Sequence, residues 1–393
     1  MGTTRRAAIA GGAGALLLTA LGAYRAVDRG VFSLARGPAF RPWREWRGIA
    51  IEGHRRPLHA AILAASPHNT QPWLFQPSGD SIAVLADRSR NLGAFDPFRR
   101  EMHLGIGCAI ENLMRAAGVF GWSPNVIVNG GRLAPSPGPA PVRAAQIWLD
   151  PAPAMRDPLF EAIPHRHTNR GPYHRRPIEG SALAWLRNLG SNGETQIAFI
   201  EDPFERHDLR RLIIAATERI IADPEMSKAS AAWMRTGRRE VNERRDGIST
   251  DNAGLSPFTM AMAKLLPDAS PTRADRYWLE MTREVQSRAP MFGMILVRDR
   301  FEMGPAIAAG RAWQRLHLAA TQMGLAAQPL NQPLECADRN EELGRRDEFA
   351  PELAKFADAS GWEPTFLFRL GWPENWAPPS PRRPLGAVLT ERA

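Results

Sequence analysis

The stretch Ala64-Ala-Ser-Pro-His-Asn-Thr-Gln-Pro-Trp73 decides how the rest of the sequence is interpreted. An amphipathic pattern over residues 55–65 predicts a helix that ends at Ser66-Pro67, because the residue before a proline disfavours helix. The turn that follows presents exposed backbone amides and the side chains of Asn69 and Gln71. Groups that both donate and accept hydrogen bonds can read the edge of a planar heterocycle. The alternative is an ordinary helix-ending turn whose tryptophan packs in the core.

A second informative segment is Arg166-His-Thr-Asn-Arg170, in which two arginines four residues apart flank the hydroxyl of Thr168. Paired guanidinium groups with a hydroxyl donor suit a phosphate monoester. A solvated basic loop is the alternative. Two further segments are weak when taken alone. They are Pro329-Leu-Asn-Gln332, and Gly371-Trp-Pro373 followed by Arg382-Arg383.

Together and in this order, the four segments resemble the nitroreductase family, and more closely its tandem branch, the Acg-like FMN-binding proteins. Residues 69–73 look like that family's Pro-Ser-x-x-Asn-x-Gln-Pro-Trp turn. Residues 166–170 look like its Arg-x-Ser-x-Arg/Lys motif for the FMN phosphate, with threonine in place of serine. Residues 370–373 with Arg382-Arg383 are similar to its Gly-Tyr/Phe-Pro … Arg ending. The resemblance covers residues 50–390.

The resemblance implies an α+β fold of the nitroreductase type, built as two fused halves that form an intramolecular pseudo-dimer. In the usual family homodimer, the Asn-x-Gln-Pro-Trp turn reaches a flavin that the other subunit mainly holds. Here the first half (41–155) carries that turn, whereas the second half (156–393) carries the phosphate motif and the arginine ending. One FMN per chain follows. A weak internal repeat of residues 107–121 over 310–324 favours duplication. The polar segment 234–257 is long for a plain loop and is a candidate lid.

By this resemblance, the chain is an FMN-dependent oxidoreductase that passes hydride from NAD(P)H through FMN to a small acceptor in ping-pong order. The alternative is an FMN-sequestering protein with little turnover, and a third reading is a cell-envelope protein without flavin. No catalytic side chain is assigned, since the flavin carries the chemistry. The residues implied in FMN binding are Pro67, Asn69, Gln71, Arg166, Thr168, Arg170, Asn331, Gln332, Arg382 and Arg383.

One position departs from the family pattern. Ordinary nitroreductases have an acidic residue and a glycine near the flavin N5 edge, whereas this chain has Asn331-Gln332 there. The departure leaves open how reactive the flavin is.

The N-terminus has the pattern of an export signal. Arg5-Arg6 precede a weakly apolar run, Ala7–Ala23, and paired arginines at this place resemble a twin-arginine signal. The run also approaches the length that spans a bilayer, so an anchor is the alternative. We therefore expect residues 1–40 to be a signal or anchor that engages the twin-arginine translocation machinery. The protein would then be periplasmic, or membrane-anchored and facing outward.

Composition narrows the remaining possibilities. The 393 residues are 44% hydrophobic and 23% charged, as in globular proteins. The net charge of +9 is spread along the chain with no nucleic-acid-binding motif, so a nucleic-acid partner is not expected. The two cysteines, Cys108 and Cys336, lack histidines at zinc-site spacing, and no metal is expected. They could pair in an exported protein, or remain buried thiols. A monomer with pseudo-dimer architecture is expected.

Overall fold

The computed structural model describes residues 22–390, apart from residues 33, 50, 52, 136–137, 267–269 and 358–359. The strands are β1 (Trp73–Ser78), β2 (Ser81–Ala86), β3 (Trp122–Val128), β4 (Val142–Pro151), β5 (Gln196–Ile200), β6 (Met234–Arg235), β7 (Ile248–Ser249), β8 (Met291–Val297), β9 (Ala326–Pro329) and β10 (Glu363–Gly371). The helices are α2 (Arg41–Arg44), α3 (Leu58–Ala61), α4 (Arg100–Val119), α5 (Pro158–Ala162), α6 (Gly180–Gly190), α7 (Pro203–Ala222), α8 (Pro224–Ala231), α9 (Arg238–Arg244), α10 (Pro257–Leu265), α11 (Pro271–Met281), α12 (Met303–Gln322), α13 (Gln332–Glu342) and α14 (Ala350–Ala354). A helical segment over residues 22–28 precedes them.

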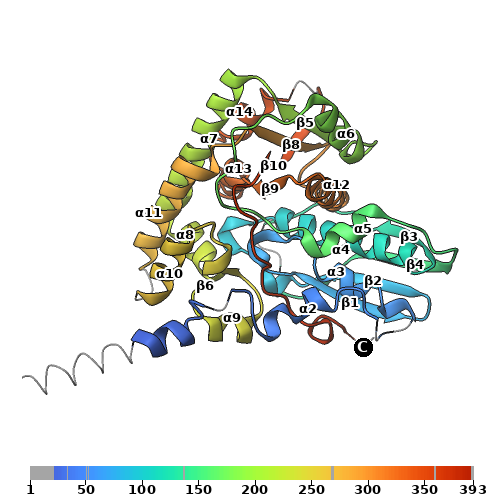
Figure 1. Ribbon diagram of the computed structural model, residues 1–393. Coiled ribbons are helices and arrows are strands. Elements are labelled where there is room, and N and C mark those ends of the chain that lie inside the picture. The colour runs from blue at the N-terminus through green and yellow to red at the C-terminus, as the bar shows by residue number, and fades with distance from the viewer. Residues whose placement is uncertain are drawn as a thin grey trace, which may run out of the picture.

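Two sheets of the same topology organise the molecule. One has the strand order β1-β2-β4-β3 and the other β5-β8-β10-β9, and all pairs in both are antiparallel. A long helix follows the second strand of each sheet, α4 in the first half and α12 in the second. These two helices lie side by side between the sheets (Figure 1). The predicted α+β fold with two similar halves is confirmed, while the boundary at residues 155 and 156 stays a prediction.

The contact between α4 and α12 is close to two-fold symmetric. A Cβ on Gly107 would overlap the Ile307 carbonyl oxygen, and a Cβ on Gly310 would overlap the Leu104 carbonyl oxygen. The same offset of 203 residues relates Gly107 to Gly310 and Leu104 to Ile307. Reciprocal contacts of this kind are what an isologous dimer interface shows. The two halves therefore pack against each other as two subunits of a dimer would.

Replacing Gly310 with alanine is expected to destabilise the protein by roughly 1–3 kcal/mol, because the new methyl group meets backbone that cannot move aside. Gly304 lies in the same helix with no atom within 4 Å of a built Cβ, and it provides a matched control. Gly304→Ala should leave stability unchanged or raise it by up to about 1 kcal/mol. Chemical denaturation of both variants measures the difference, and equal stabilities would show that the helix crossing is not tight.

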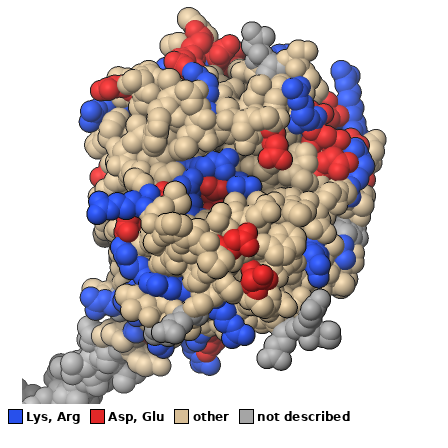
Figure 2. Space-filling model, turned by 90° about the vertical axis from the view of Figure 1, so that its right-hand side faces the viewer, with Lys and Arg blue, Asp and Glu red and all other residues tan. Residues whose placement is uncertain are grey.

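Burial differs between the two sheets. All seven residues of β8 are buried, because α12 covers one face of its sheet and α7, α13 and α14 cover the other. In β3, half-buried and exposed residues alternate, which is the pattern of a strand with one face toward solvent. Figure 2 shows basic and acidic side chains interspersed over one face of the molecule. On that face, the surplus positive charge does not form a continuous stripe.

Several helix starts follow directly from the sequence. Asp157, Asp202, Asp223 and Ser256 each precede a proline and accept a hydrogen bond from a backbone amide of the first helical turn. Such residues satisfy amides that have no partner within the helix, and proline suits the first helical position. These caps fix the beginnings of α5, α7, α8 and α10.

The predicted export signal cannot be compared with the structure. Arg5-Arg6 and residues 7–21 of the apolar run lie outside the described residues. Within the described part of the chain, no helix combines the length and the apolar character that crossing a membrane requires.

Candidate functional site

The turn over residues 64–73 has an unusual backbone. The φ angles of His68, Asn69 and Gln71 are 44°, 56° and 51°, in the left-handed region that residues other than glycine seldom adopt. The amide of the buried Gln71 holds the turn in place. Its Oε1 accepts from the Arg383 backbone amide at 2.8 Å, and its Nε2 donates to the Arg245 carbonyl at 2.9 Å. Local strain that three chain segments maintain together is typical of a functional site.

The helix before this turn is shorter than the sequence pattern predicts. Residues 55–65 were expected to be helical, yet α3 ends at Ala61. After it, Leu63 and Ala64 donate to carbonyls three residues back, which is the tighter 3₁₀ arrangement. The Leu63 and Ala64 carbonyls instead accept from two arginine side chains that approach from the second half. The helix end is thus completed by Arg166 and Arg382.

Two buried arginines, Arg166 and Arg382, and the half-buried Arg170 converge beside the turn, and within the described residues none of them forms an ion pair with a carboxylate. Arg166 donates to the Leu63 carbonyl at 3.2 Å and to His317 Nδ1 at 3.4 Å. Arg170 donates to the Asn252 carbonyl at 3.1 Å. Arg382 donates to Asn69 Oδ1, and to Ser380 Oγ at 2.6 Å. The site therefore holds positive charge that its hydrogen bonds solvate but do not neutralise.

This excess charge shows in the acidities of the three groups. Burial lowers the pKa of Arg166 to about 10 and that of Arg170 to about 10. For Arg382, burial lowers the pKa well below its ordinary value, and the positive charge of Arg166 lowers it further. A bound anion would raise all three values again, because it favours the protonated guanidinium. This arrangement of arginines therefore favours the binding of an anion.

The arginines face a cavity of about 410 Å³. Part of this volume is open to solvent. Five of the ten residues predicted to bind FMN line it, namely Asn69, Arg166, Thr168, Arg170 and Arg382. The other lining residues are Ala65, Ser66, His167, Gly247, Ile248, Asn252, Pro378 and Ser380. The structure therefore brings the turn of the first half and the arginines of the second half to one site.

The other five predicted residues do not line this cavity. Pro67 and Gln71 lie in the turn itself, and Arg383 donates from its side chain to the Gln71 carbonyl at 3.2 Å. Asn331 and Gln332 lie at the start of α13. Asn331 Nδ2 donates to Glu101 Oε1 at 2.9 Å, and Asn331 Oδ1 accepts from the Leu367 amide at 2.8 Å. Both ends of the Asn331 amide thus make structural bonds, and a flavin contact for this residue stays a prediction.

Asn331 belongs to a buried acidic cluster. Burial raises the pKa of Glu101 to about 7 and that of Glu335 well above its ordinary range, while Arg100 opposes the shift in both. Arg100 Nε also donates to Asp338 Oδ2 at 2.7 Å. The cluster ties α13 to the start of α4, so it connects the two halves away from the cavity.

The candidate lid, residues 234–257, reaches the cavity and supplies three lining residues that were not predicted from the sequence, Gly247, Ile248 and Asn252. It contains α9 and the short strands β6 and β7. Its backbone carbonyls at Gly247 and Asn252 accept from Asn69 Nδ2, at 3.0 Å, and from Arg170. These donors are two of the groups predicted to bind FMN. Backbone carbonyls carry no sequence signature, so only the length and polarity of the segment could have indicated its role.

The approximate two-fold symmetry of the α4–α12 contact relates the cavity to a second place on the other side of that contact. The two places differ in how their arginines are compensated. The 203-residue offset relates Gln314, whose Oε1 accepts from the Ala65 amide at the base of the turn, to Glu111. Glu111 forms ion pairs with Arg115, Arg311 and Arg315 at 2.9, 3.2 and 2.8 Å. A carboxylate already compensates the arginines there. Of these two related places, only the cavity beside residues 64–73 keeps uncompensated arginines.

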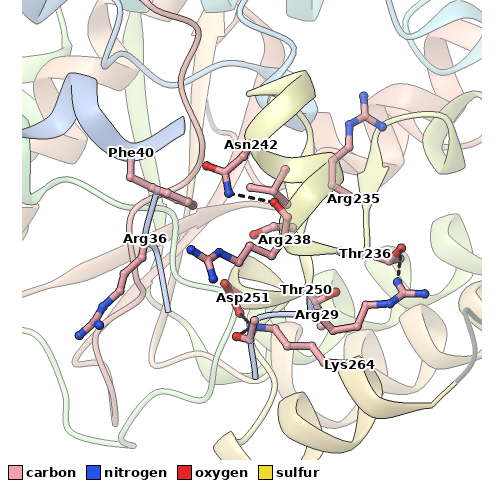
Figure 3. A pocket seen from close by; sticks show the side chains of 14 residues that line it. Arg29, Arg36, Phe40, Arg235, Thr236, Arg238, Asn242, Thr250, Asp251 and Lys264 are labelled. Carbon is pink, nitrogen blue, oxygen red and sulfur yellow. Dashed lines mark hydrogen bonds and ion pairs between the residues drawn. The ribbon is translucent and has the colours of Figure 1, made fainter. Parts of the chain in front are cut away.

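A second hollow, of about 310 Å³, lies beside the N-terminal segment (Figure 3). Arg29, Arg36, Arg238 and Lys264 are among its lining residues, and Lys264 is paired with Asp251. Elsewhere in the described chain, Cys108 and Cys336 are free, buried thiols. The described residues contain no group of three or more side chains that could hold a metal ion.

The chain is similar in sequence to proteins that are named as candidate NAD(P)H nitroreductases. The chain is 28% identical over 346 residues to a candidate NAD(P)H nitroreductase of Mycobacterium tuberculosis, Rv3131, covering 85% of this chain and 90% of that protein. It is 27% identical over 351 residues to the candidate NAD(P)H nitroreductase acg of the same organism, covering 86% and 95%. No protein-family model matches the sequence.

Solved structures similar to this chain carry nitroreductase names as well. The FMN-dependent nitroreductase NfnB from Mycobacterium smegmatis, in complex with NADPH, is 19% identical with a TM-score of 0.37, covering 60% of this chain and 98% of its own. A nitroreductase with bound FMN from Desulfitobacterium hafniense is 13% identical with a TM-score of 0.36, covering 61% and 100%.

Proposed function

We propose that this chain is an FMN-dependent oxidoreductase of the nitroreductase type, with one flavin bound between its two halves. The observation that carries the proposal is the cavity in which Arg166, Arg170 and Arg382 meet without a carboxylate, beside the turn that bears Asn69. The similarity to proteins named NAD(P)H nitroreductases over 90–95% of their length supports it.

The residues of the cavity fit a flavin mononucleotide. Arg166 and Arg382 each keep a buried Nε without a hydrogen-bond partner, which a phosphate oxygen would satisfy. Thr168, which lies between these arginines in the sequence motif, also lines the cavity, and its hydroxyl would be a further donor. We assign Asn69 to the heterocycle edge, although its Oδ1 now accepts from Arg382, and its Nδ2 would reach a ligand only if the Gly247 carbonyl withdrew. A tandem fusion would explain how one chain supplies both sets of residues.

When bound, FMN would supply the redox chemistry, accepting hydride from NAD(P)H and passing electrons to a small acceptor in ping-pong order. The role of the protein chain would be to bind, orient and shield the cofactor. Buried arginines also stabilise negative charge on a ligand, and such preorganised donors act strongly where water is excluded.

A specific observation favours the second candidate function, FMN sequestration with little turnover. The Gly247 and Asn252 carbonyls contact the predicted flavin-binding donors, so the lid covers the ligand face of the site. A lid that stays closed over bound FMN would retain the cofactor and exclude a second substrate.

We expect purified protein to contain one FMN per chain and to lose its yellow colour when NADPH is added without oxygen. Released flavin measured against protein gives the stoichiometry. Two FMN per chain would contradict the single site, and a protein that binds no flavin would contradict the proposal. Bound flavin that neither NADPH nor NADH reduces would favour sequestration.

We further propose export by the twin-arginine route. The support is Arg5-Arg6 before the weakly apolar run Ala7–Ala23. Replacing both arginines with lysine should retain the precursor in the cytoplasm, since this signal depends on the arginine pair. Cell fractionation measures the outcome, and normal export of the lysine variant would contradict the assignment.

A further inference from the structure

Helix α10 (Pro257–Leu265) has the reverse of the usual amphipathic arrangement. Its only charged residue, Lys264, is buried, forms an ion pair with Asp251, and donates to the Gly30 carbonyl at 3.0 Å. Two large apolar side chains lie on its outward face instead, with Thr259 beside them. Phe258 is 76% exposed, and Met262 is exposed as well. A helix on a water-facing surface normally buries such residues and exposes its lysines. This outer face is therefore suited to contact with something other than water.

The apolar surface continues onto the N-terminal segment. Arg25 Nε donates to the Leu265 carbonyl at 2.6 Å, which joins that segment to the end of α10. Of the 16 exposed large hydrophobic residues among those described, seven lie on these two neighbouring segments. Scattered exposed apolar residues need no explanation, but a concentration indicates an interaction surface. The seven are Tyr24, Val27, Phe32, Leu34, Phe258, Met262 and Leu266, and we call them the N-terminal apolar face.

Cationic side chains border this face. The hollow in Figure 3 places Arg29, Arg36 and Arg238 around Lys264 and Asp251. Arg36 and Arg238 are exposed, and neither has a carboxylate within ion-pair distance in the described part of the chain. An apolar surface with a basic border matches the headgroup–acyl boundary of an anionic bilayer, where apolar side chains insert and arginines meet phosphates.

We propose that the N-terminal apolar face docks on the surface of an anionic phospholipid membrane. In the sequence, the apolar run Ala7–Ala23 immediately precedes and overlaps the first residues of this segment, which is consistent with a membrane as the occupant. A protein partner would also fit an apolar surface, but the basic border favours lipid phosphates. This role is independent of flavin binding, because the cavity of the flavin site shares none of the seven residues.

Two phenylalanines give a matched pair for the test. Phe258 and Phe204 are each the second residue of a helix that begins with proline, and they are 76% and 81% exposed. Because Cys108 and Cys336 are buried, a thiol-reactive environment-sensitive dye can be placed on the full chain through Phe258→Cys or Phe204→Cys. Vesicles of phosphatidylglycerol mixed with phosphatidylcholine should blue-shift the dye at position 258, and nitroxide lipids should quench it there. Position 204 should not respond.

A charge-reversal pair tests the basic border. Changing Arg36 and Arg238 to glutamate should raise the lipid concentration needed for the response at position 258 by about 25-fold or more, since each basic residue near an anionic surface contributes about fivefold. The equal change at the exposed Arg345 and Arg346, outside this face, should have little effect. Equal responses at positions 258 and 204, no response at 258, or an equal response with phosphatidylcholine alone would overturn the proposal. A lipid-independent shift that rises with protein concentration would show self-association and would also overturn it.

Discussion

Replacing Arg166 with alanine is expected to weaken FMN binding by about 10- to 150-fold while leaving riboflavin binding nearly unchanged. Hydrogen bonds to a charged group contribute roughly 1.5–3 kcal/mol, and 1.4 kcal/mol corresponds to tenfold in affinity. Riboflavin lacks the phosphate that Arg166 would contact. Arg170→Ala should behave in the same way, because both arginines line one cavity. Fluorescence titration of the two flavins measures the ratio directly.

Control variants separate phosphate contact from structural support. Arg166 also bonds the Leu63 carbonyl, so its loss could loosen the helix end and weaken both flavins alike. Arg166→Lys keeps the charge without the planar fork and should have an intermediate effect on FMN. Asn69→Ala should weaken FMN and riboflavin alike, as it is assigned to the ring end. If Arg166→Ala also weakens both flavins equally, the phosphate is bound elsewhere.

Adjacent arginines give a further comparison. Arg382 lines the cavity, whereas the Arg383 side chain donates to the Gln71 and Ala387 carbonyls. The sequence motif assigns both to FMN. The geometry favours Arg382 as the phosphate ligand, so Arg382→Ala should reduce the preference for FMN over riboflavin, and Arg383→Ala should not.

The sequence predicted the parts of this site that depend on side-chain chemistry. Arginine spacing around Thr168 and the amides of the 64–73 turn identified groups that lie some 100 residues apart in the chain and together in space. The α+β class followed from the family resemblance that these segments carry. Each segment alone also fitted an ordinary turn or a solvated loop. The order of the segments along the chain was what indicated a single site.

Other features required the fold. Asn331 was assigned to the flavin from its neighbourhood in sequence, yet both ends of its amide bond to Glu101 and to the backbone of β10. That pairing depends on how α13 packs against α4. Helix α3 is shorter than predicted, and side chains from the second half bond to the Leu63 and Ala64 carbonyls just after its end. Long-range bonds of this kind override local helix preference and leave no periodic pattern in the sequence.

Replacing Asp246 with alanine is expected to open the lid. The carboxylate of this buried residue pairs with Arg90 and with Arg235, the latter at 2.8 Å. Removing one partner from a buried pair costs roughly 3–5 kcal/mol, and we expect the lower end because Arg90 is partly exposed. Two arginines would then face each other without compensation. Since Gly247 follows directly, the loss should release the hydrogen bonds between that residue and Asn69.

Hydrogen exchange measures this opening locally. A loss of about 3 kcal/mol corresponds to roughly 100-fold faster exchange at the Gly247 and Ile248 amides, with the core strand β8 unaffected. Glu243→Ala is the matched control, because its ion pair with Arg239 lies in the same segment but is exposed and therefore contributes little. Faster exchange of β8 in the Asp246 variant would mean global unfolding and not lid opening.

If the candidate lid limits access to the cavity, FMN should also enter and leave the Asp246 variant faster, because freeing Asn69 and Arg170 from the lid carbonyls removes the competing acceptors. Unchanged flavin exchange rates in a variant with an open lid would show that the segment covers the site without controlling entry.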